Sequence, residues 1–150
     1  MKSILIIDDD EKMRDALKQY FDESGYRVIE ASNGKNALAL LKNDRPDLVI
    51  TDIFMAEMDG VEVIMNIREK YPNIRIIAMS GGSTISAPDC LDAASDLGAA
   101  DIFHKPFALK DMFGFAFFNI DISRSLQAST FLECGFLKCF CHVIKSGYTF

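Results

Sequence analysis

Short apolar runs alternate with stretches of helical period along most of this 150-residue chain. Apolar residues in the longer stretches recur three and four positions apart, as in a helix with one buried face. The predicted strands are Lys2–Ile7, Tyr26–Ala31, Leu48–Thr51, Arg75–Met79 and Ile102–His104. The predicted helices are Glu11–Glu23, Asn36–Leu41, Val61–Tyr71 and one from Pro88 to near Gly98. This order predicts an α/β fold, a doubly wound parallel sheet with helices on both faces.

Composition and charge exclude several classes of protein. Apolar residues make up 49% and charged residues 25%, which is ordinary for a globular protein. The net charge is −6, and no cluster of Lys and Arg offers a footprint for direct nucleic-acid binding. The apolar runs Ile4–Ile7 and Met112–Phe118 are shorter than the roughly 20 residues that span a bilayer, and the first lacks a signal-peptide cleavage region. We therefore expect a cytoplasmic protein without a membrane span.

The four cysteines do not predict a disulfide framework. Cys134, Cys139 and Cys141 crowd near the end of the chain, far from Cys90. In a cytosolic protein these thiols are expected to stay reduced. Their spacing matches no familiar zinc module, so we predict no metal site there.

Chemically active side chains follow the predicted strands at the point where each strand ends. Asp8 and Asp9 follow the first strand, Asp52 the third, Ser80 the fourth and Lys105 the fifth. Ligands of open parallel sheets bind at these carboxyl ends, so we expect the five side chains to meet in one crevice. A ligand set made only of oxygens with high negative charge suits a hard cation, and Mg²⁺ fits best.

This combination of side chains suits the acceptance of a phosphoryl group. A carboxylate can act as the nucleophile, a metal ion can neutralise charge, and Ser and Lys can bind the phosphoryl oxygens. The Lys105-Pro106 step is a candidate cis peptide bond, because only bonds before proline adopt cis at modest cost. Asp59-Gly60 is predicted to be a turn and helix start, and His104 a packed or surface residue.

Four motifs carry a resemblance to a known family. The motifs "ILIIDDD", "LVITDIFMAEMDG", "IIAMSGG" and "HKPF" occur in this order, each at a predicted strand end. Together they resemble the CheY-like receiver domain of bacterial two-component response regulators, over residues 1 to about 112. The resemblance implies a flavodoxin-like, five-stranded sheet with strand order 2-1-3-4-5.

The resemblance also implies a role for each site residue. Asp52 would accept the phosphoryl group, Ser80 would contact it, and Lys105 would pair with it. The Mg²⁺ ligands would be Asp8, Asp9, Asp52 and the backbone carbonyl of Phe54. Asp10 would lie outside the metal's ligands.

By the same resemblance, the protein is a phosphorelay signalling domain rather than a classical enzyme. A histidine kinase or phosphotransfer protein would supply the phosphoryl group. A downstream protein would bind the face formed by the fourth helix, the fifth strand and the fifth helix. The bulk of Phe54 predicts slow spontaneous loss of the phosphoryl group.

Two positions depart from the family pattern. Ala56 stands where the family usually has proline, and Ile102 replaces an aromatic residue that usually turns inward as the switch hydroxyl moves. Phe103 is adjacent, but neighbouring side chains of a strand point to opposite faces. The aromatic residue of the usual switch is therefore absent at position 102 of this chain.

Two other functions remain open. A receiver-like docking module that never takes up phosphate would share the fold. A small Mg²⁺-dependent phosphatase of the haloacid dehalogenase type also uses an aspartate nucleophile, a Ser or Thr and a Lys. That family places its nucleophile on the first strand, and here only Asp111 follows Lys105 closely. The order of motifs therefore favours the receiver.

The composition changes after Met112. Five of the 38 residues from Phe113 to Phe150 are charged, and eight of the chain's twelve Phe lie there. The stretch Phe113–Asp121 is apolar on all sides with Gly114 inside, which is untypical of a surface helix. We assign residues 1–118 to the receiver domain and 119–150 to an atypical Cys- and Phe-rich tail. The tail could be an apolar docking segment or a divergent or frame-shifted end, and we favour the second.

Overall fold

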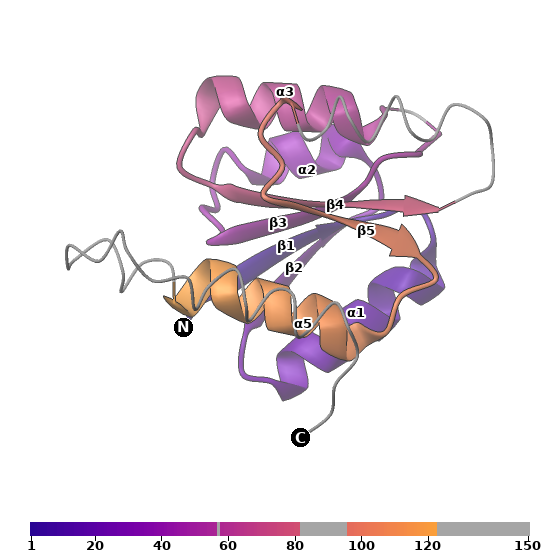
Figure 1. Ribbon diagram of the computed structural model, residues 1–150. Helices are drawn as coiled ribbons and strands as arrows, with labels where there is room; N and C mark the ends of the chain where they lie inside the picture. The colour runs from indigo at the N-terminus through magenta and orange to yellow at the C-terminus, as the bar shows by residue number, and fades with distance from the viewer. Residues whose placement is uncertain (57, 82–95, 123–150) are drawn as a thin grey trace.

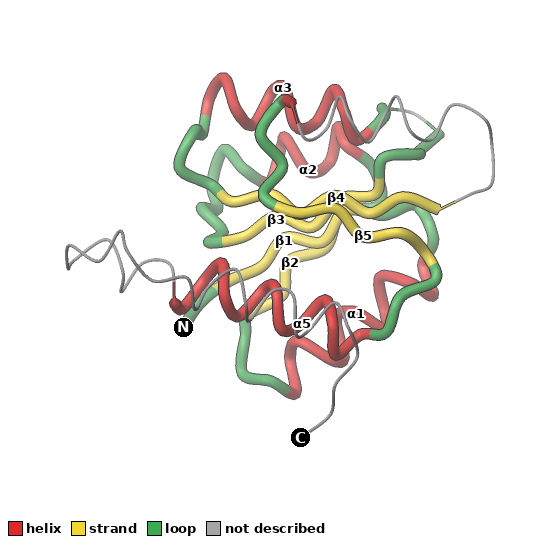
Figure 2. Tube along the Cα trace, in the orientation of Figure 1, coloured by secondary structure: helices red, strands yellow, loops and turns green. Residues whose placement is uncertain are grey.

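Five parallel strands form one sheet in the order β2-β1-β3-β4-β5 (Figures 1 and 2). The structure is a computed structural model that describes residues 1–56, 58–81 and 96–122, without the side chains of residues 121 and 122. The strands are β1 (Ser3–Ile7), β2 (Arg27–Ala31), β3 (Leu48–Asp52), β4 (Arg75–Gly81) and β5 (Asp101–Lys105). The predicted doubly wound class and strand order are confirmed.

Helices cover both faces of the sheet, with α1 and α5 on one side and α2 and α3 on the other (Figure 1). Their bounds are α1 (Glu11–Glu23), α2 (Gly34–Leu40), α3 (Gly60–Lys70) and α5 (Leu109–Phe117), and a π-helical segment, η1 (Phe118–Ile122), follows α5 directly. Within the described ranges, no helix is long and apolar enough to cross a bilayer.

Three of the helices begin with the same type of cap. The side chains of Asp10, Asn33 and Asp59 each accept a hydrogen bond, of 2.8–2.9 Å, from a backbone amide in the first turn of α1, α2 and α3. Such a cap satisfies an N–H group that the helix leaves without a partner. Because each cap follows a strand closely, these helix starts line the carboxyl edge of the sheet.

The core consists of two apolar layers separated by the sheet. Along β1, Ile4 and Ile6 pack toward α1 and α5, whereas Leu5 and Ile7 pack toward α2 and α3. This alternation is the period of two that a strand imposes. All of β1 is buried because both faces are covered, which explains its unbroken apolar sequence.

The boundaries differ from the sequence prediction by one or two residues at several ends. The second helix begins at Gly34 rather than at residue 36, and the fourth strand continues to Gly81. The peptide bond between Lys105 and Pro106 is cis, as predicted. The predicted helix from Pro88 to near Gly98 falls almost entirely outside the described residues.

The stretch after Met112 forms a helix although its sequence is untypical of one. Met112, Phe115 and Ala116 make the buried stripe of α5. Phe113 lies on a second stripe, where its ring meets Tyr20 of α1 at 5.9 Å between centroids. Helix α5 therefore packs on both the sheet and α1, so a wide apolar surface is compatible with its position.

Candidate functional site

The predicted site residues meet at the carboxyl edge of the sheet. Asp8 follows β1 directly, Asp52 ends β3, Ser80 lies near the end of β4 and Lys105 ends β5. The Asp8 residue is fully buried, and Asp52 and Ser80 are 6% and 3% exposed. Asp9 is exposed. The parallel register thus brings together residues from four strands that are far apart in the sequence.

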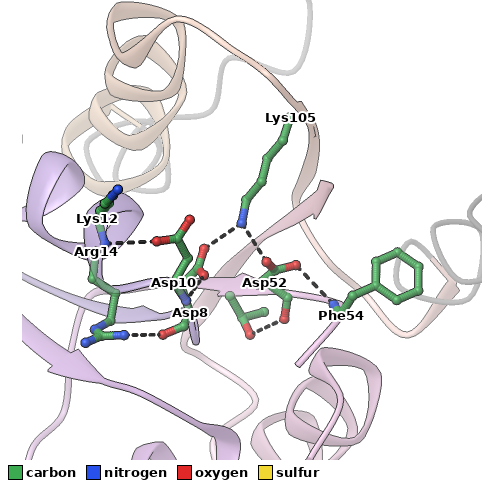
Figure 3. Close-up of polar contacts among 8 residues, drawn as sticks. Asp8, Asp10, Lys12, Arg14, Asp52, Phe54 and Lys105 are labelled. Carbon is green, nitrogen blue, oxygen red and sulfur yellow. Dashed lines mark hydrogen bonds and ion pairs between the residues drawn. The ribbon is translucent and has the colours of Figure 1, made fainter. Parts of the chain in front are cut away.

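Lys105 connects the two buried carboxylates (Figure 3). Its Nζ atom lies 2.6 Å from Oδ2 of Asp8 and 2.5 Å from Oδ2 of Asp52. The Lys105 side chain is 16% exposed, so water screens these ion pairs only weakly. One ammonium group therefore balances part of the charge of two carboxylates.

The second oxygen of each buried carboxylate accepts a backbone amide. The amide of Asp10 donates to Oδ1 of Asp8 at 2.9 Å, and that of Phe54 donates to Oδ1 of Asp52 at 3.0 Å (Figure 3). The Asp10 carboxylate itself caps α1. These bonds fix the orientation of both carboxylates before any ligand is bound.

The acidic cluster has the composition of a divalent-cation site. Carboxylate oxygens of Asp8, Asp9 and Asp52 lie within 4.8 Å of one another. Carboxylate oxygen is the ligand type that Mg²⁺ prefers, and Mg²⁺ commonly uses few protein ligands and keeps several waters. An exposed Asp9 beside two buried carboxylates leaves one side of the cluster open. The residues present therefore fit a hydrated Mg²⁺ ion.

The electrostatics of the site follow from two carboxylates sharing one ammonium. Burial raises the pKa of Asp52, and the nearby Asp8 charge adds to this rise. The hydrogen bonds and charge of Lys105 and the Phe54 amide oppose the rise without cancelling it. Burial alone would lower the pKa of Lys105, but its pairing with Asp52 and Asp8 outweighs burial, so that its pKa is raised. Lys105 therefore stays cationic at neutral pH.

Two residues that the sequence interpretation missed donate hydrogen bonds to the backbone of the acidic site residues. Arg14 of α1 donates from Nη1 to the carbonyl oxygen of Asp8 at 2.8 Å. The buried Thr51 donates its hydroxyl to the carbonyl oxygen of Asp52 at 2.9 Å. A polar residue inside the apolar run "LVITD" was a usable signal for Thr51. The Arg14 contact depends on how α1 packs beside the end of β1, and no sequence motif indicates that packing.

The remaining predicted residues lie nearby. Ser80 is buried in β4, in register with His104 of β5, whose side chain is exposed. Phe54 follows β3 by two residues, and its half-buried ring points away from the carboxylates in Figure 3. Ile102 and Phe103 face opposite sides of the sheet, as predicted.

The comparisons with known proteins identify the family. Residues 4–115 match the response regulator receiver domain. The chain belongs to the response regulator receiver family. Sporulation initiation phosphotransferase F of Bacillus subtilis is 34% identical over 111 residues, which is 74% of this chain and 87% of that protein. Response regulator MprA of Mycolicibacterium vanbaalenii is 36% identical over 109 residues, 73% of this chain but 46% of the relative. The chain thus matches about half of the length of MprA.

Solved receiver structures share the fold. A CheY-like receiver domain protein from Methanospirillum hungatei superposes with a TM-score of 0.77 at 26% identity, covering 83% of this chain and 98% of that one. Response regulator protein TrrA from Thermotoga maritima, solved in complex with Mg²⁺-BeF, has a TM-score of 0.68 at 32% identity. That comparison covers 77% of this chain and 96% of TrrA. The agreement supports a receiver fold over the described residues.

Proposed function

We propose that this receiver domain accepts a phosphoryl group on Asp52 in two-component or phosphorelay signalling. The observation that carries the proposal is the double ion pair of Lys105 with Asp8 and Asp52. It unites the predicted acceptor, a predicted metal ligand and the predicted phosphoryl-binding cation at one edge of the sheet. The family match and the Mg²⁺-BeF complex of the relative TrrA support this assignment.

In the proposed reaction, an Asp52 carboxylate oxygen attacks the phosphorus atom of a phosphohistidine. A P–O bond to Asp52 forms as the P–N bond to the donor histidine breaks, and the electron pair of that bond stays on the histidine nitrogen. The amide of Phe54 holds one Asp52 oxygen and thereby directs the carboxylate. When bound, Mg²⁺ would neutralise charge on the carboxylates and on the phosphoryl oxygens. Asp8, Asp9, Asp52 and the Phe54 carbonyl are its proposed ligands.

Lys105 and Ser80 are the proposed partners of the transferred group. Lys105 stays charged and already contacts the acceptor, so it can pair with a phosphoryl oxygen after small movements. Ser80 is buried one strand away from Asp52, where its hydroxyl can donate to the same group. A charge added at Asp52 would thus draw residues of β4 and β5 toward it and shift the conformational population.

The proposed partners follow from the family role. A histidine kinase or phosphotransfer protein would donate the phosphoryl group, and a downstream protein would bind the surface that includes β5 and α5. We propose residues 1–118 as the receiver domain and 119–150 as an atypical tail. Asn119 and Ile120 are also buried, so the packing of this domain extends slightly beyond residue 118.

A labelling experiment separates this function from its alternatives. The protein is incubated with ³²P-labelled acetyl phosphate and Mg²⁺, and both protein-bound label and released phosphate are followed. A receiver should reach at most one equivalent of bound label and release it slowly. Rapid release of many equivalents without accumulation of bound label would indicate a phosphatase instead. Folded protein without bound label or released phosphate would indicate a docking module.

A further inference from the structure

Gly60, the first residue of α3, lies directly against the backbone of Asp52. A Cβ atom placed on Gly60 would lie 2.1 Å from the carbonyl oxygen of Asp52 and 2.7 Å from Cα of Ile53. Real Cβ atoms essentially never come closer than 3.0 Å to such neighbours. Both neighbours are backbone atoms, so a side-chain rotation cannot relieve the contact. Only a residue without a side chain allows the two segments to approach this closely.

Backbone hydrogen bonds connect the end of β3 both to Gly60 and to β4. The amide of Gly60 donates to the carbonyl oxygen of Ile53 at 2.8 Å. The amide of Ile53 donates to the carbonyl oxygen of Met79 in β4 at 2.9 Å. Asp59 caps α3 through the amide of Glu62 at 2.8 Å. The end of β3 is therefore fixed between β4 and the first turn of α3.

We infer that Gly60 is a positioning residue for Asp52. Because it lacks a side chain, the start of α3 can fix the backbone that carries the Asp52 carboxylate between Lys105 and the Phe54 amide. Relieving the contact made by an added Cβ would require a displacement of about 1 Å, and misplacement on that scale can cost about 100-fold in rate. The consequence for phosphorylation rests on the proposed function, whereas the consequence for the geometry of the acidic cluster does not.

Gly34 offers a matched control at the start of α2. It is also buried and also follows an Asx cap, Asn33. A Cβ atom there would lie 2.4 Å from Cγ2 of Val63 and 2.9 Å from Cγ of Met58. These atoms belong to side chains and not to Asp52. Gly34→Ala should therefore overpack the apolar layer between the sheet and helices α2 and α3 without a steric clash against Asp52.

The test compares Gly60→Ala with Gly34→Ala in the full chain. Calorimetry measures the Mg²⁺ dissociation constant, and NMR follows the amide of Phe54, which reports on the bond to Asp52. We expect both variants to lose thermal stability, but only Gly60→Ala should weaken Mg²⁺ binding tenfold or more and shift the Phe54 amide. Gly34→Ala should stay within threefold of the wild type. A folded Gly60→Ala protein that matches Gly34→Ala in Mg²⁺ affinity and Phe54 shift would overturn the inference.

Two additions keep the test decisive if Gly60→Ala alone does not fold. Gly114→Ala can be introduced as a background, because a Cβ atom there meets nothing within 4 Å and alanine favours the helix. In the wild type, hydrogen exchange at the Gly60 amide should be as slow as in β3, and exchange at the rate of an exposed loop would contradict the inference. A wild type that binds Mg²⁺ but accepts no phosphoryl group would refute the proposed function alone.

Discussion

The ammonium nitrogen of Lys105 lies 2.5 Å from Oδ2 of Asp52, although the two residues are 53 positions apart. Strand β4 separates their strands in the sheet, and the same nitrogen reaches Asp8 beyond β3 at 2.6 Å. Lys105 therefore spans the carboxyl edge of four strands. Removal of this charge should affect both the stability of the fold and the binding of cations.

Lys105→Met, which keeps the length of the side chain, should destabilise the Mg²⁺-free protein by about 2 kcal/mol. Breaking a fully buried pair costs about 3–5 kcal/mol. The loss should be smaller here because Lys105 is 16% exposed. Urea unfolding followed by circular dichroism measures it, since the chain has no tryptophan. In saturating Mg²⁺, most of the difference in unfolding free energy between Lys105→Met and the wild type should disappear. The bound cation then balances the carboxylate charge that Lys105 no longer pairs.

The exposed Lys110 of α5 provides the control for that measurement. Lys110→Met should change the unfolding free energy by less than about 0.5 kcal/mol, as surface substitutions usually do. Equal losses in the two variants would contradict the structural role of the Lys105 ion pairs.

The stability of Asp52→Asn relative to the wild type should depend on pH. Because burial raises the pKa of Asp52 in the folded state, ionisation of this group costs folding free energy. This cost is absent below the ordinary Asp pKa of about 3.9 and grows as the pH rises through the folded value. In EDTA, Asp52→Asn should therefore gain stability relative to the wild type between pH 4 and pH 7. A difference that is constant or shrinks with rising pH would argue against the raised pKa.

Arg68 should contribute to stability without affecting the site. Its guanidinium donates to the carbonyl oxygens of Pro72, Ile74 and Gly98 at 3.1, 2.7 and 2.5 Å. These bonds join α3 to segments that precede β4 and β5, at the sheet edge opposite Asp52. Arg68→Met should cost about 2 kcal/mol in urea unfolding, given that hydrogen bonds to charged groups contribute about 1.5–3 kcal/mol each and Arg68 is partly exposed. The Mg²⁺ affinity of Arg68→Met should stay within twofold of the wild type. A larger change would show that the edge near Arg68 is coupled to the carboxyl edge of the sheet.

Phe54→Asn should shorten the lifetime of the phosphorylated protein several-fold. Phe54 places apolar bulk two residues after the proposed acceptor, and a smaller polar side chain should admit water more readily. The rate of label loss after removal of acetyl phosphate measures this effect, with Phe54→Leu as an apolar control. Because the ring points away from Asp52 in Figure 3, equal lifetimes for Asn and wild type would assign Phe54 to packing alone.

The sequence predicted the elements whose periodicity is strong. Helix α1 was predicted at its observed bounds, because its apolar residues recur regularly at helical spacing. Prediction was weakest at the end of the domain, where the sequence of α5 does not show that Phe113 packs on α1 rather than facing water. Such tertiary contacts decide whether an apolar residue is buried.

The sequence predicted which side chains form the site and that they lie at the carboxyl edge of the sheet. It did not predict the contacts between them. Strand ends placed Asp8, Asp52 and Lys105 together because parallel strands share a carboxyl edge. The sequence could not show that Lys105 contacts both carboxylates, since this depends on the reach of one side chain across two strands. The approach of Gly60 to Asp52 was also hidden, because the pair Asp-Gly mainly indicates a turn.

Intact-mass spectrometry after incubation with acetyl phosphate, with and without Mg²⁺, on wild type and Asp52→Asn tests most directly whether Asp52 accepts a phosphoryl group. We expect a hydroxylamine-labile adduct of about 80 Da, the mass of one phosphoryl group bound as an acyl phosphate, on the wild type with Mg²⁺ only. Asp52→Asn should remain unmodified under the same conditions. No adduct on folded wild-type protein, or an equal adduct on Asp52→Asn, would contradict the assignment of Asp52 as the phosphoacceptor.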